Sequence, residues 1–309
     1  MNIKKDGIAL VGQKGTILVP PEPPIPVEKQ NLCYGTAGPG TIAGICVAGK
    51  DVVLLPYPGQ EHSKIDTVGR RVKGVSITGF EIRGFSGENI ALYGAEDASI
   101  RKNKLVDGEV YGFLTVGSKN TDVRDNDITS TPTDPSAPYR FRFIAICSDN
   151  YEGSTVWHND IDNYGIALCV QTNGANYQHN HVTNSCYGVF VDPGVKGAIV
   201  RHNDIGPTNP KCGTAFGFSS GIVLFGAIDT QVEHNDIKGQ TLGASATPTN
   251  AGAGIAVLDV PGSPATGNRI IRNEAFDNDV DLANGAASTT NVFKKNKCAT
   301  SFPDGLCIP

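Results

Sequence analysis

The feature that most constrains this chain is a short pattern that recurs around an asparagine. An apolar residue is followed by two residues, Asn, one further residue and a second apolar residue, as in 156–161, 177–182 and 200–205. The asparagine recurs at Asn103, Asn126, Asn159, Asn180, Asn203, Asn235, Asn273 and Asn296, and Phe80 takes its place one unit earlier. Successive copies lie 21 to 38 residues apart, and the shortest steps are 21 to 23 residues. Such self-similarity constrains the fold more strongly than any local propensity does.

A unit of this length, with three brief apolar segments and no helical periodicity, is typical of one coil of a parallel β-helix. We therefore predict an all-β fold in which one chain winds into about 10 coils and builds three parallel sheets. The asparagine falls at a sharp bend, where its amide can cap backbone groups and bond to the next copy. We interpret the column as a structural Asn ladder in one turn of the coil.

Four histidines each precede a ladder asparagine by one residue, namely His158, His179, His202 and His234. Their repeated place beside a bend favours solvated turn residues. A metal site of stacked imidazoles is the alternative, because His is a common metal ligand. We predict neither a metal nor a cofactor.

The overall charge argues against two classes of partner. The 309 residues carry a formal net charge of −5 and no Lys/Arg run, so a nucleic-acid partner has no support. No apolar run reaches the length of a membrane span. The repeats continue without a break in composition, which predicts one domain over residues 1–309. Inserted loops are expected near 20–43, 50–71, 130–142, 206–219 and 238–252. The oligomeric state is not indicated.

The eight cysteines favour an oxidising compartment, and hence a secreted or extracytoplasmic protein with four disulfides. Two pairs are close in the sequence and two occupy equivalent places in neighbouring coils: Cys33 with Cys46, Cys298 with Cys307, Cys147 with Cys169, and Cys186 with Cys212. The first five residues run directly into a strand, so we expect that a targeting segment has been removed.

Three insertions, 130–142, 206–219 and 238–252, follow the Asn-containing strand and precede a strand that begins Gly-Ile. They leave the coil at the same turn, so they should wall one sheet. In that sheet Ile166 and Leu168 are expected to point inward and alternate residues to face outward. The outward residues are mostly apolar and should be covered, either by the inserted loops or by a ligand.

The two columns, Ile/Val-x-x-Asn-x-Ile and Gly-Ile-x-Leu, resemble the right-handed parallel β-helix repeats of the pectate-lyase-like superfamily. The resemblance covers nearly the whole chain and implies a right-handed winding, with a substrate along the walled sheet. Because this scaffold carries polysaccharide lyases, glycoside hydrolases, mannuronan epimerases and phage tailspikes, it does not fix the activity. The polygalacturonase motifs are missing. The run 187–194 is similar to the Tyr-Gly-Phe-Asp-Pro-His run of mannuronan C5-epimerases, with two residues inserted and Gly194 in place of His.

We predict an enzyme that acts on a carbohydrate along this sheet, of the polysaccharide lyase or epimerase type. That chemistry needs a base near C5 of the sugar, an acid for the leaving oxygen and a cation beside the carboxylate. The candidate catalytic residues are Asp192, Tyr187, Arg140 and Arg142. The candidate substrate-binding residues are Tyr93, Leu114, Val116, Phe190, Val223, Phe225 and His62, with Lys64 near His62 on the opposite rim.

Two alternatives remain open. If the insertions close over the outward apolar residues, the pocket suits a cyclase or isomerase of a hydrophobic small molecule. A non-catalytic binding or structural rod would instead use the apolar flank as an assembly interface.

Overall fold

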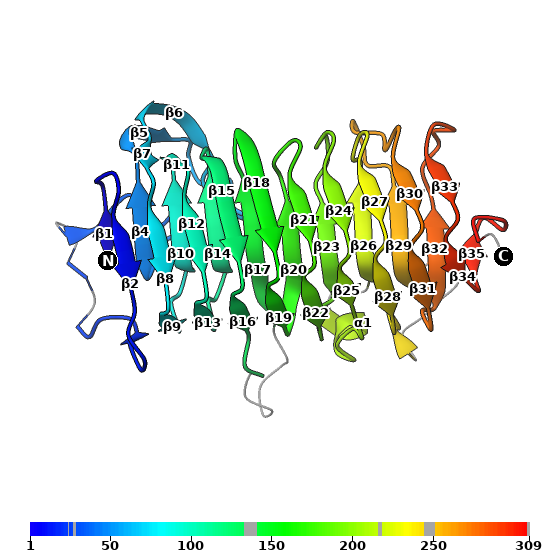
Figure 1. The fold of residues 1–309 in the computed structure, drawn as a ribbon, viewed down its shortest axis with the longest axis horizontal. Helices are drawn as coiled ribbons and strands as arrows, with labels where there is room; N and C mark the ends of the chain where they lie inside the picture. Colours follow the sequence, from blue (N-terminus) through cyan, green and yellow to red (C-terminus); the bar gives the residue numbers. More distant parts are fainter. Residues whose placement is uncertain (24, 27–28, 133–140, 216–217, 244–250, 308–309) are drawn as a thin grey trace. The chain divides into compact units, whose positions relative to one another are not determined.

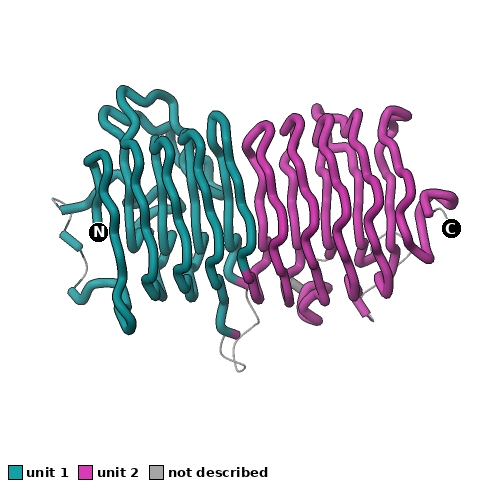
Figure 2. The backbone as a smooth tube through the Cα atoms, viewed as in Figure 1, with its two compact units in different colours: residues 1–131, 142–159 teal, residues 132–141, 160–309 magenta. Residues whose placement is uncertain are grey.

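The computed structural model describes residues 1–23, 25–26, 29–132, 141–215, 218–243 and 251–307, with the backbone alone for 214 and 215. The chain divides into two compact units (Figure 2). Unit 1 comprises residues 1–131 and 142–159, and unit 2 comprises residues 132–141 and 160–309. In both units short strands stand side by side in parallel rows (Figure 1). The single domain predicted over residues 1–309 stays a prediction.

Unit 1 winds its strands into three parallel sheets, called A, B and C. Sheet A contains, in order of pairing, β1 (Asn2–Ile3), β4 (Ile45–Ala48), β10 (Glu88–Tyr93), β14 (Tyr111–Val116) and β17 (Arg142–Asp149). Sheet B contains β2 (Ala9–Val11), β8 (Ser76–Thr78), β12 (Ser99–Arg101), β15 (Lys119–Arg124) and β18 (Glu152–Trp157), with the short β7 (Val72–Lys73) and β11 (Ala95–Glu96) at its side. Sheet C contains β3 (Ile17–Leu18), β9 (Glu81–Arg83), β13 (Lys104–Val106) and β16 (Asp127–Thr129). The insertion near 50–71 is more ordered than the expected loop, because β5 (Lys50–Leu54) and β6 (Ile65–Arg70) pair as an antiparallel hairpin.

Unit 2 repeats the same three sheets. Sheet A contains β20 (Tyr164–Val170), β23 (Tyr187–Val191), β26 (Ser219–Phe225), β29 (Gly252–Leu258), β32 (Val280–Asn284) and β35 (Ser301–Phe302). Sheet B contains β21 (Asn176–Gln178), β24 (Ile199–Arg201), β27 (Gln231–Glu233), β30 (Arg269–Ile271) and β33 (Val292–Lys294). Sheet C contains β19 (Asp160–Asp162), β22 (His181–Thr183), β25 (Asp204–Ile205), β28 (Asp236–Lys238), β31 (Glu274–Phe276) and β34 (Lys297–Cys298). A single helical turn, α1 (Cys212–Ala215), lies in the insertion 206–219. Within the described ranges, no helix has the length and apolar character to cross a membrane.

The all-β prediction is therefore confirmed, and the fold is a parallel β-helix. The glycine that opens the Gly-Ile strands is required by the interior. A Cβ atom at Gly188 or Gly221 would collide with the side chain of Ile205 or Ile237, so that position faces a filled core. Core packing thus excludes a larger residue at Gly188 and Gly221.

Leu168 pairs with Val189, and both are fully buried in the row that faces inward, as predicted for Leu168. Ile166 pairs with Tyr187, which packs with the outward ring of Phe190, so the inward prediction is wrong for Ile166.

The asparagine column forms a hydrogen-bonded ladder in each unit. In unit 2, Asn203 Oδ1 accepts hydrogen bonds from the backbone N and from Nδ2 of Asn180, both at 3.0 Å. Asn203 Nδ2 donates to the Tyr177 carbonyl at 3.1 Å and to Asn235 Oδ1 at 2.9 Å. The same pattern joins Asn103, Asn126 and Asn159 in unit 1. Every ladder asparagine is at most 2% exposed, which confirms the structural interpretation of the column.

The histidines before the ladder are turn residues, as predicted. His158, His179, His202 and His234 all have φ between 52° and 54°. This left-handed conformation is uncommon for residues other than glycine, and histidine is among the residue types enriched in it. All four side chains are exposed.

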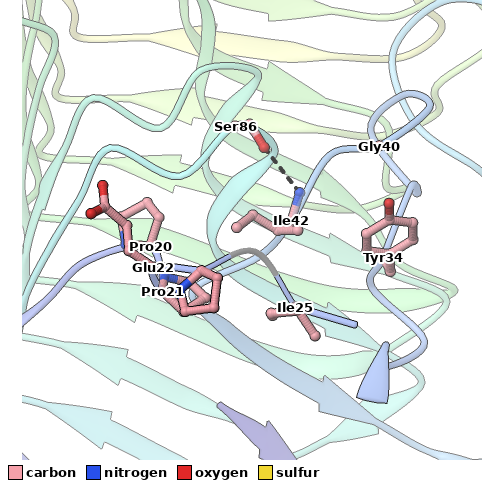
Figure 3. Close-up of a pocket in the computed structure, with 9 residues that line it drawn as sticks. Pro20, Pro21, Glu22, Ile25, Tyr34, Gly40, Ile42 and Ser86 are labelled. Atoms are coloured by element: carbon pink, nitrogen blue, oxygen red, sulfur yellow. Dashed lines mark hydrogen bonds between the residues drawn. The ribbon is translucent and has the colours of Figure 1, made fainter. Parts of the chain in front are cut away.

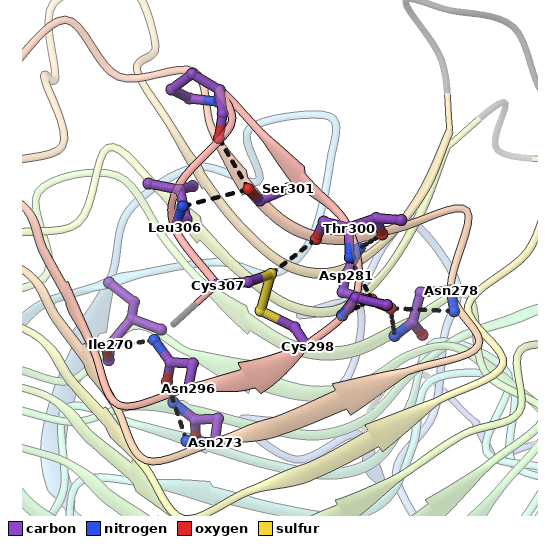
Figure 4. Close-up of a disulfide and its surroundings, with 12 residues drawn as sticks. Ile270, Asn273, Asn278, Asp281, Asn296, Cys298, Thr300, Ser301, Leu306 and Cys307 are labelled. Atoms are coloured by element: carbon purple, nitrogen blue, oxygen red, sulfur yellow. Dashed lines mark hydrogen bonds between the residues drawn. A yellow bond between two sulfur atoms is a disulfide. The ribbon is translucent and has the colours of Figure 1, made fainter. Parts of the chain in front are cut away.

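Three of the four predicted disulfides are present: Cys33–Cys46, Cys186–Cys212 and Cys298–Cys307. Figure 4 shows the last of them beside the C-terminal end of the Asn ladder, where Asn273 Nδ2 donates to Asn296 Oδ1. Nearby, Asp281 accepts hydrogen bonds from the backbone N–H groups of Ala299 and Thr300, which ties the last coil to its neighbour. Cys147 and Cys169 are buried in different units, and their pairing stays a prediction.

We predict that Asn203→Ala lowers the free energy of unfolding by about 2–4 kcal/mol, because the buried Asn180 N–H and Tyr177 carbonyl lose their partner. The matched control is Asn173→Ala, because Asn173 is exposed and accepts one hydrogen bond, from the Lys196 backbone. The control should cost less than about 1 kcal/mol. Urea unfolding measures both variants, and equal losses would show that the ladder does not support the coil.

Candidate ligand-binding surface

The outward face of sheet A is aligned from coil to coil within each unit. In unit 1 the partners across neighbouring strands include Cys46, Ala91, Leu114 and Cys147. In unit 2 they are Cys169, Phe190, Val223, Ala256 and Ala283. Strand registers therefore place an apolar row on the outside of each unit, and the two rows differ in what covers them.

In unit 1 the chain itself covers this row. Residues 33–43, before β4, and residues 55–64, after β5, form the cover and are joined by a hydrogen bond from the Ser63 backbone N to the Thr36 carbonyl. The first part is attached to sheet A by the Cys33–Cys46 disulfide and by a hydrogen bond from Thr36 Oγ1 to Glu88 Oε1 at 3.0 Å. Tyr93, Leu114 and Val116, predicted to bind substrate, are at most 1% exposed. A ligand could reach them only if the covering segment moved away.

His62 attaches the second part of this cover, residues 55–64. Its Nδ1 lies 3.0 Å from Tyr111 Oη and its Nε2 lies 3.1 Å from Asp149 Oδ2. Lys64 Nζ lies 2.9 Å from the same Asp149 oxygen. Burial would raise the pKa of Asp149, but the His62 hydrogen bond and the Lys64 charge outweigh it and lower that pKa. Because His62 is fully buried, its position fits a fastening role better than the predicted contact with substrate.

Burial lowers the pKa of His62 despite its hydrogen bond to Asp149, so the imidazole is favoured in its neutral form. For Lys64, the charge of Asp149 overcomes burial and raises the pKa. The charged pair in this cluster is therefore Lys64 with Asp149, and neither group is poised to exchange a proton near neutral pH.

Glu88 is a second ionisable group buried beneath the covering residues of unit 1. Its side chain is fully buried, and burial raises its pKa to about 7, with the Thr36 hydrogen bond acting in the opposite direction. Glu88 Oε2 and the hydroxyl of Tyr93 are among the buried side-chain atoms of the described residues that have no hydrogen-bond partner. Burial also raises the pKa of Tyr93 well above its ordinary value.

In unit 2 the outward row carries aromatic side chains that remain partly exposed. We call Tyr187, Phe190, Phe218 and Phe225 the aromatic surface. The ring centroids of Tyr187 and Phe190 are 5.6 Å apart in an edge-to-face arrangement, and those of Phe190 and Phe225 are 5.6 Å apart. Phe218 extends the group, with its ring 5.8 Å from Tyr187. Val223 and Ala256 pack against these rings and are buried.

One end of the aromatic surface is walled by all three predicted insertions. Phe141, Cys212 and Leu242, one from each insertion, pack with Cys186 into a buried cluster, and Tyr187 lies against it. The Cys186–Cys212 disulfide joins the insertion 206–219 to the residue before β23. Burial raises the pKa of Tyr187 to about 12, so its hydroxyl remains protonated at neutral pH. This hydroxyl can donate a proton or hydrogen bond, but it is a poor base.

Asp192 and Gln171 add polar groups beside the rings. Asp192 directly follows β23, and its Oδ2 accepts a hydrogen bond from Gln171 Nε2 at 2.6 Å. Its side chain is partly exposed, as a residue that touches substrate must be. Gln171 and Phe218 were not predicted. Gln171 could have been found by aligning neighbouring coils, because it takes the position of Asp192 in the coil before. Phe218 could not be found in this way, because it lies in an insertion that has no equivalent in other coils.

The two candidate arginines are placed differently. Arg142 opens β17 in unit 1, where it pairs with Asp107 Oδ1 at 3.0 Å and Glu109 Oε2 at 3.7 Å. It also donates to Ser130 and to the Thr131 carbonyl. These contacts fit an anchor for the adjoining insertion. Arg140 lies outside the described residues.

A separate hollow of about 620 Å³ lies in unit 1 between the proline-rich excursion and the loop before β4 (Figure 3). Its described lining is Pro20, Pro21, Glu22, Pro23, Ile25, Tyr34, Gly40, Ile42 and Ser86. Glu22 is the one carboxylate in that lining, so the hollow offers no carboxylate pair for acid and base chemistry. No described group of three or more His, Cys, Asp or Glu side chains is arranged to hold a metal ion.

The chain is a parallel β-helix protein, and it belongs to the family described as right-handed β-helix region, which matches residues 64–237. No curated protein matches its sequence. Among solved structures, it is similar to the Dettilon tailspike protein gp208, with a TM-score of 0.57 and 16% identity over 97% of this chain. It covers 61% of the tailspike chain.

Two other solved structures show lower similarity. One is the DFA-IIIase of Arthrobacter chlorophenolicus A6 without its lid, with a TM-score of 0.49 and 14% identity over 85% of this chain and 69% of that one. The other is the catalytic unit of the GH87 α-1,3-glucanase of Streptomyces thermodiastaticus, with a TM-score of 0.44 and 10% identity over 84% of this chain and 55% of that one. The similarity to the tailspike protein, at 16% identity, shows a shared fold alone.

We predict that Glu88→Gln reduces the pH dependence of unfolding. A pKa of about 7 in the folded chain exceeds the ordinary carboxyl value, so stability from this group is present below about pH 4.5 and is lost as pH rises through about 7. Gln can still accept the Thr36 hydrogen bond and carries no charge. Urea unfolding measures the free energy of unfolding at about pH 5 and about pH 8. The decrease in this free energy between the two pH values should be smaller in the variant by up to about 3 kcal/mol. An unchanged difference would mean that Glu88 ionises freely in the folded protein.

Proposed function

We propose that this chain is a carbohydrate-active protein that holds its ligand along the aromatic surface of unit 2. A sugar ring has apolar C–H faces and polar edges, so it suits a site with aromatic rings and a few polar groups. Tyr187, Phe190 and Phe225 supply the rings, and Asp192 with Gln171 supplies hydrogen-bonding groups beside them. The observation that carries the proposal is the partial exposure of these rings, whereas the equivalent face of unit 1 is covered.

The proposed reaction is the elimination or epimerisation of a uronic-acid unit. In elimination, the Asp192 carboxylate takes the C5 proton, the electron pair forms the C4–C5 double bond, and the C4–O bond breaks. Tyr187 supports this assignment because it is protonated at neutral pH and could donate to the leaving oxygen. In epimerisation the proton returns to the opposite face of C5. The cation that neutralises the sugar carboxylate is assigned to Arg140, because Arg142 already pairs with Asp107 and Glu109.

A second candidate is a cyclase or isomerase of a hydrophobic small molecule. The outward cluster of unit 2 favours it because this cluster is almost entirely apolar. It consists of Val223, Ala253 and Ala256 with the partly buried residues packed on them, and the Tyr187 hydroxyl is its one polar side-chain group. An apolar ligand would gain more from such a surface than a sugar would.

We also propose a secreted or extracytoplasmic location. Three disulfides support it, because such bonds persist in oxidising compartments and are rare in the cytosol.

We predict that the protein forms an unsaturated product from a polyuronate, seen as an increase in ultraviolet absorbance. Asp192→Asn should reduce this activity by about 100-fold or more, because the base is lost and the shape is kept. Phe190→Ala should weaken oligosaccharide binding by about three- to tenfold, as expected for an aromatic contact of roughly 0.5–1.5 kcal/mol.

The matched controls are Asp66→Asn and Phe276→Ala, which alter an exposed Asp in unit 1 and an exposed Phe on sheet C of unit 2. Both should leave activity and binding unchanged. Thermal stabilisation by apolar ligands without any response to oligosaccharides would favour the small-molecule candidate and reject the carbohydrate proposal.

A further inference from the structure

The two parts of the cover in unit 1 are held in different ways. Residues 33–43 are fixed to sheet A by a disulfide. Residues 55–64, which we call the flap, form the loop between β5 and β6 and contain no cysteine. The two strands are themselves fixed, since Val52 and Val68 pack over the turn at Gly94, where an added Cβ atom would contact both side chains. The flap is therefore a loop that can move between two anchored strands.

The flap meets the sheet mainly with polar groups. Of its residues, all of which the structure describes, only His62 and Ser63 are buried, whereas Leu55 is 46% exposed and Pro56 and Pro58 are also exposed. The imidazole attaches the flap to β14 and β17 through contacts of 3.0 and 3.1 Å. A permanent cover of an apolar row would bury its own apolar side chains against that row. The closed position of the flap therefore depends largely on hydrogen bonds and an ion pair, which a ligand can replace.

The sheet beneath the cover is acidic. Its outward positions on β10, β14 and β17 form three rows, which are Glu88, Tyr111 and Ile144, then Ala91, Leu114 and Cys147, then Tyr93, Val116 and Asp149. We call these nine residues the covered face, and they include two carboxyl groups and no basic side chain. His62 and Lys64, which face Asp149, belong to the flap and leave with it. What remains is an apolar floor with an acid at two opposite corners, and a cation with an apolar body complements it.

Two buried polar atoms of the covered face are left without a hydrogen bond. Glu88 Oε2 and Tyr93 Oη have no partner among the described residues. Burial, and then the charges of Glu88 and Asp149, raise the pKa of Tyr93, so its hydroxyl lies near both acids. Unpaired buried groups destabilise the closed form, and a ligand that bonds to them removes this penalty. Ser63 of the flap lies beside Thr36, whose hydroxyl contacts Glu88, so the departure of the flap uncovers this end of the site.

We propose that the covered face of unit 1 binds an aliphatic polyamine and that the flap occupies the site when no ligand is bound. Lys64 already shows the contact, because its ammonium lies 2.9 Å from Asp149 Oδ2 at the end of an aliphatic chain. In the complex one ligand ammonium takes the place of Lys64, a second donates to Glu88, and the methylene groups between them lie on Leu114 and its neighbours. An acidic ligand is repelled by both carboxylates. The site is separate from the aromatic surface, and the inference does not rest on the proposed function.

Calorimetry with the whole chain and spermidine tests the inference at about pH 8, with a linear octanediol as the uncharged probe. At this pH the amines are protonated and Glu88 is largely ionised. The unaltered protein should bind spermidine and ignore the diol. Glu88→Gln should bind at least about tenfold more weakly, because it loses a charge-assisted hydrogen bond and keeps the contact with Thr36. Asp160→Asn, which removes an exposed carboxylate from unit 2, should change nothing.

A weaker attachment of the flap should have the opposite effect. Lys64→Gln should bind spermidine about three- to tenfold more tightly, because the open form becomes more populated and the competing ammonium is gone. Its control is Lys14→Gln, which removes an exposed charge elsewhere in unit 1 and should leave the affinity unchanged. Hydrogen exchange reports the flap itself, because the Ser63 N–H donates to the Thr36 carbonyl at 2.7 Å while the flap is closed. Spermidine should therefore speed the exchange of the flap amides, whereas a ligand bound outside the closed flap would leave it unchanged or slow it.

Four results would each overturn the inference: no binding of spermidine, full affinity in Glu88→Gln, no tighter binding by Lys64→Gln than by Lys14→Gln, or flap amides whose exchange is unchanged or slower with spermidine. Weaker binding by Glu88→Gln, tighter binding by Lys64→Gln and faster exchange in the flap, seen together, would support it. Loss of oligosaccharide binding by Phe190→Ala bears only on the aromatic surface of unit 2.

Discussion

The hydrogen bond between stacked asparagine amides is the interaction on which the rest of the structure depends. Each ladder asparagine satisfies the backbone of its neighbour and its own coil at once, so one buried residue fixes a tight left-handed turn. The turn sets the register of the strands that follow, and register decides which side chains face outward. A shift by one residue would turn Phe190 and Phe225 toward the core and Leu168 toward solvent.

Given that register, each unit has an outward apolar row on sheet A, and such a row should not be left fully exposed to water. In unit 1 the chain covers its own row, because residues 33–43 and 55–64 are held over it by a disulfide, by Thr36 with Glu88 and by His62 with Asp149. In unit 2 the insertions wall only one end, at Tyr187, and the rings beyond it remain partly exposed. This contrast is the reason that we propose the aromatic surface of unit 2 as the ligand-binding site.

Much of this could be predicted from the sequence because a repeat supplies many copies of the same information. The ladder, the outward positions of Phe190 and Phe225, and the Cys186–Cys212 pair all follow from aligning one coil with the next. The cover over Tyr93, Leu114 and Val116 did not follow, because Thr36 and His62 lie in insertions and contact residues far away in the sequence. The spacing of Cys33 and Cys46 indicated their disulfide, but it did not show that the intervening chain folds over the sheet.

Hydroxyl-radical footprinting with and without an oligouronate tests the central claim most directly, because it reports the solvent exposure of individual aromatic rings. In the free protein, Phe190, Phe218 and Phe225 should be oxidised, and Tyr93 and Tyr111 should be protected by the covering segment. With ligand, protection should appear at the three phenylalanines and leave Phe276 unchanged. Oxidation of Tyr93 in the free protein, or ligand-induced protection that spares the aromatic surface, would contradict the account.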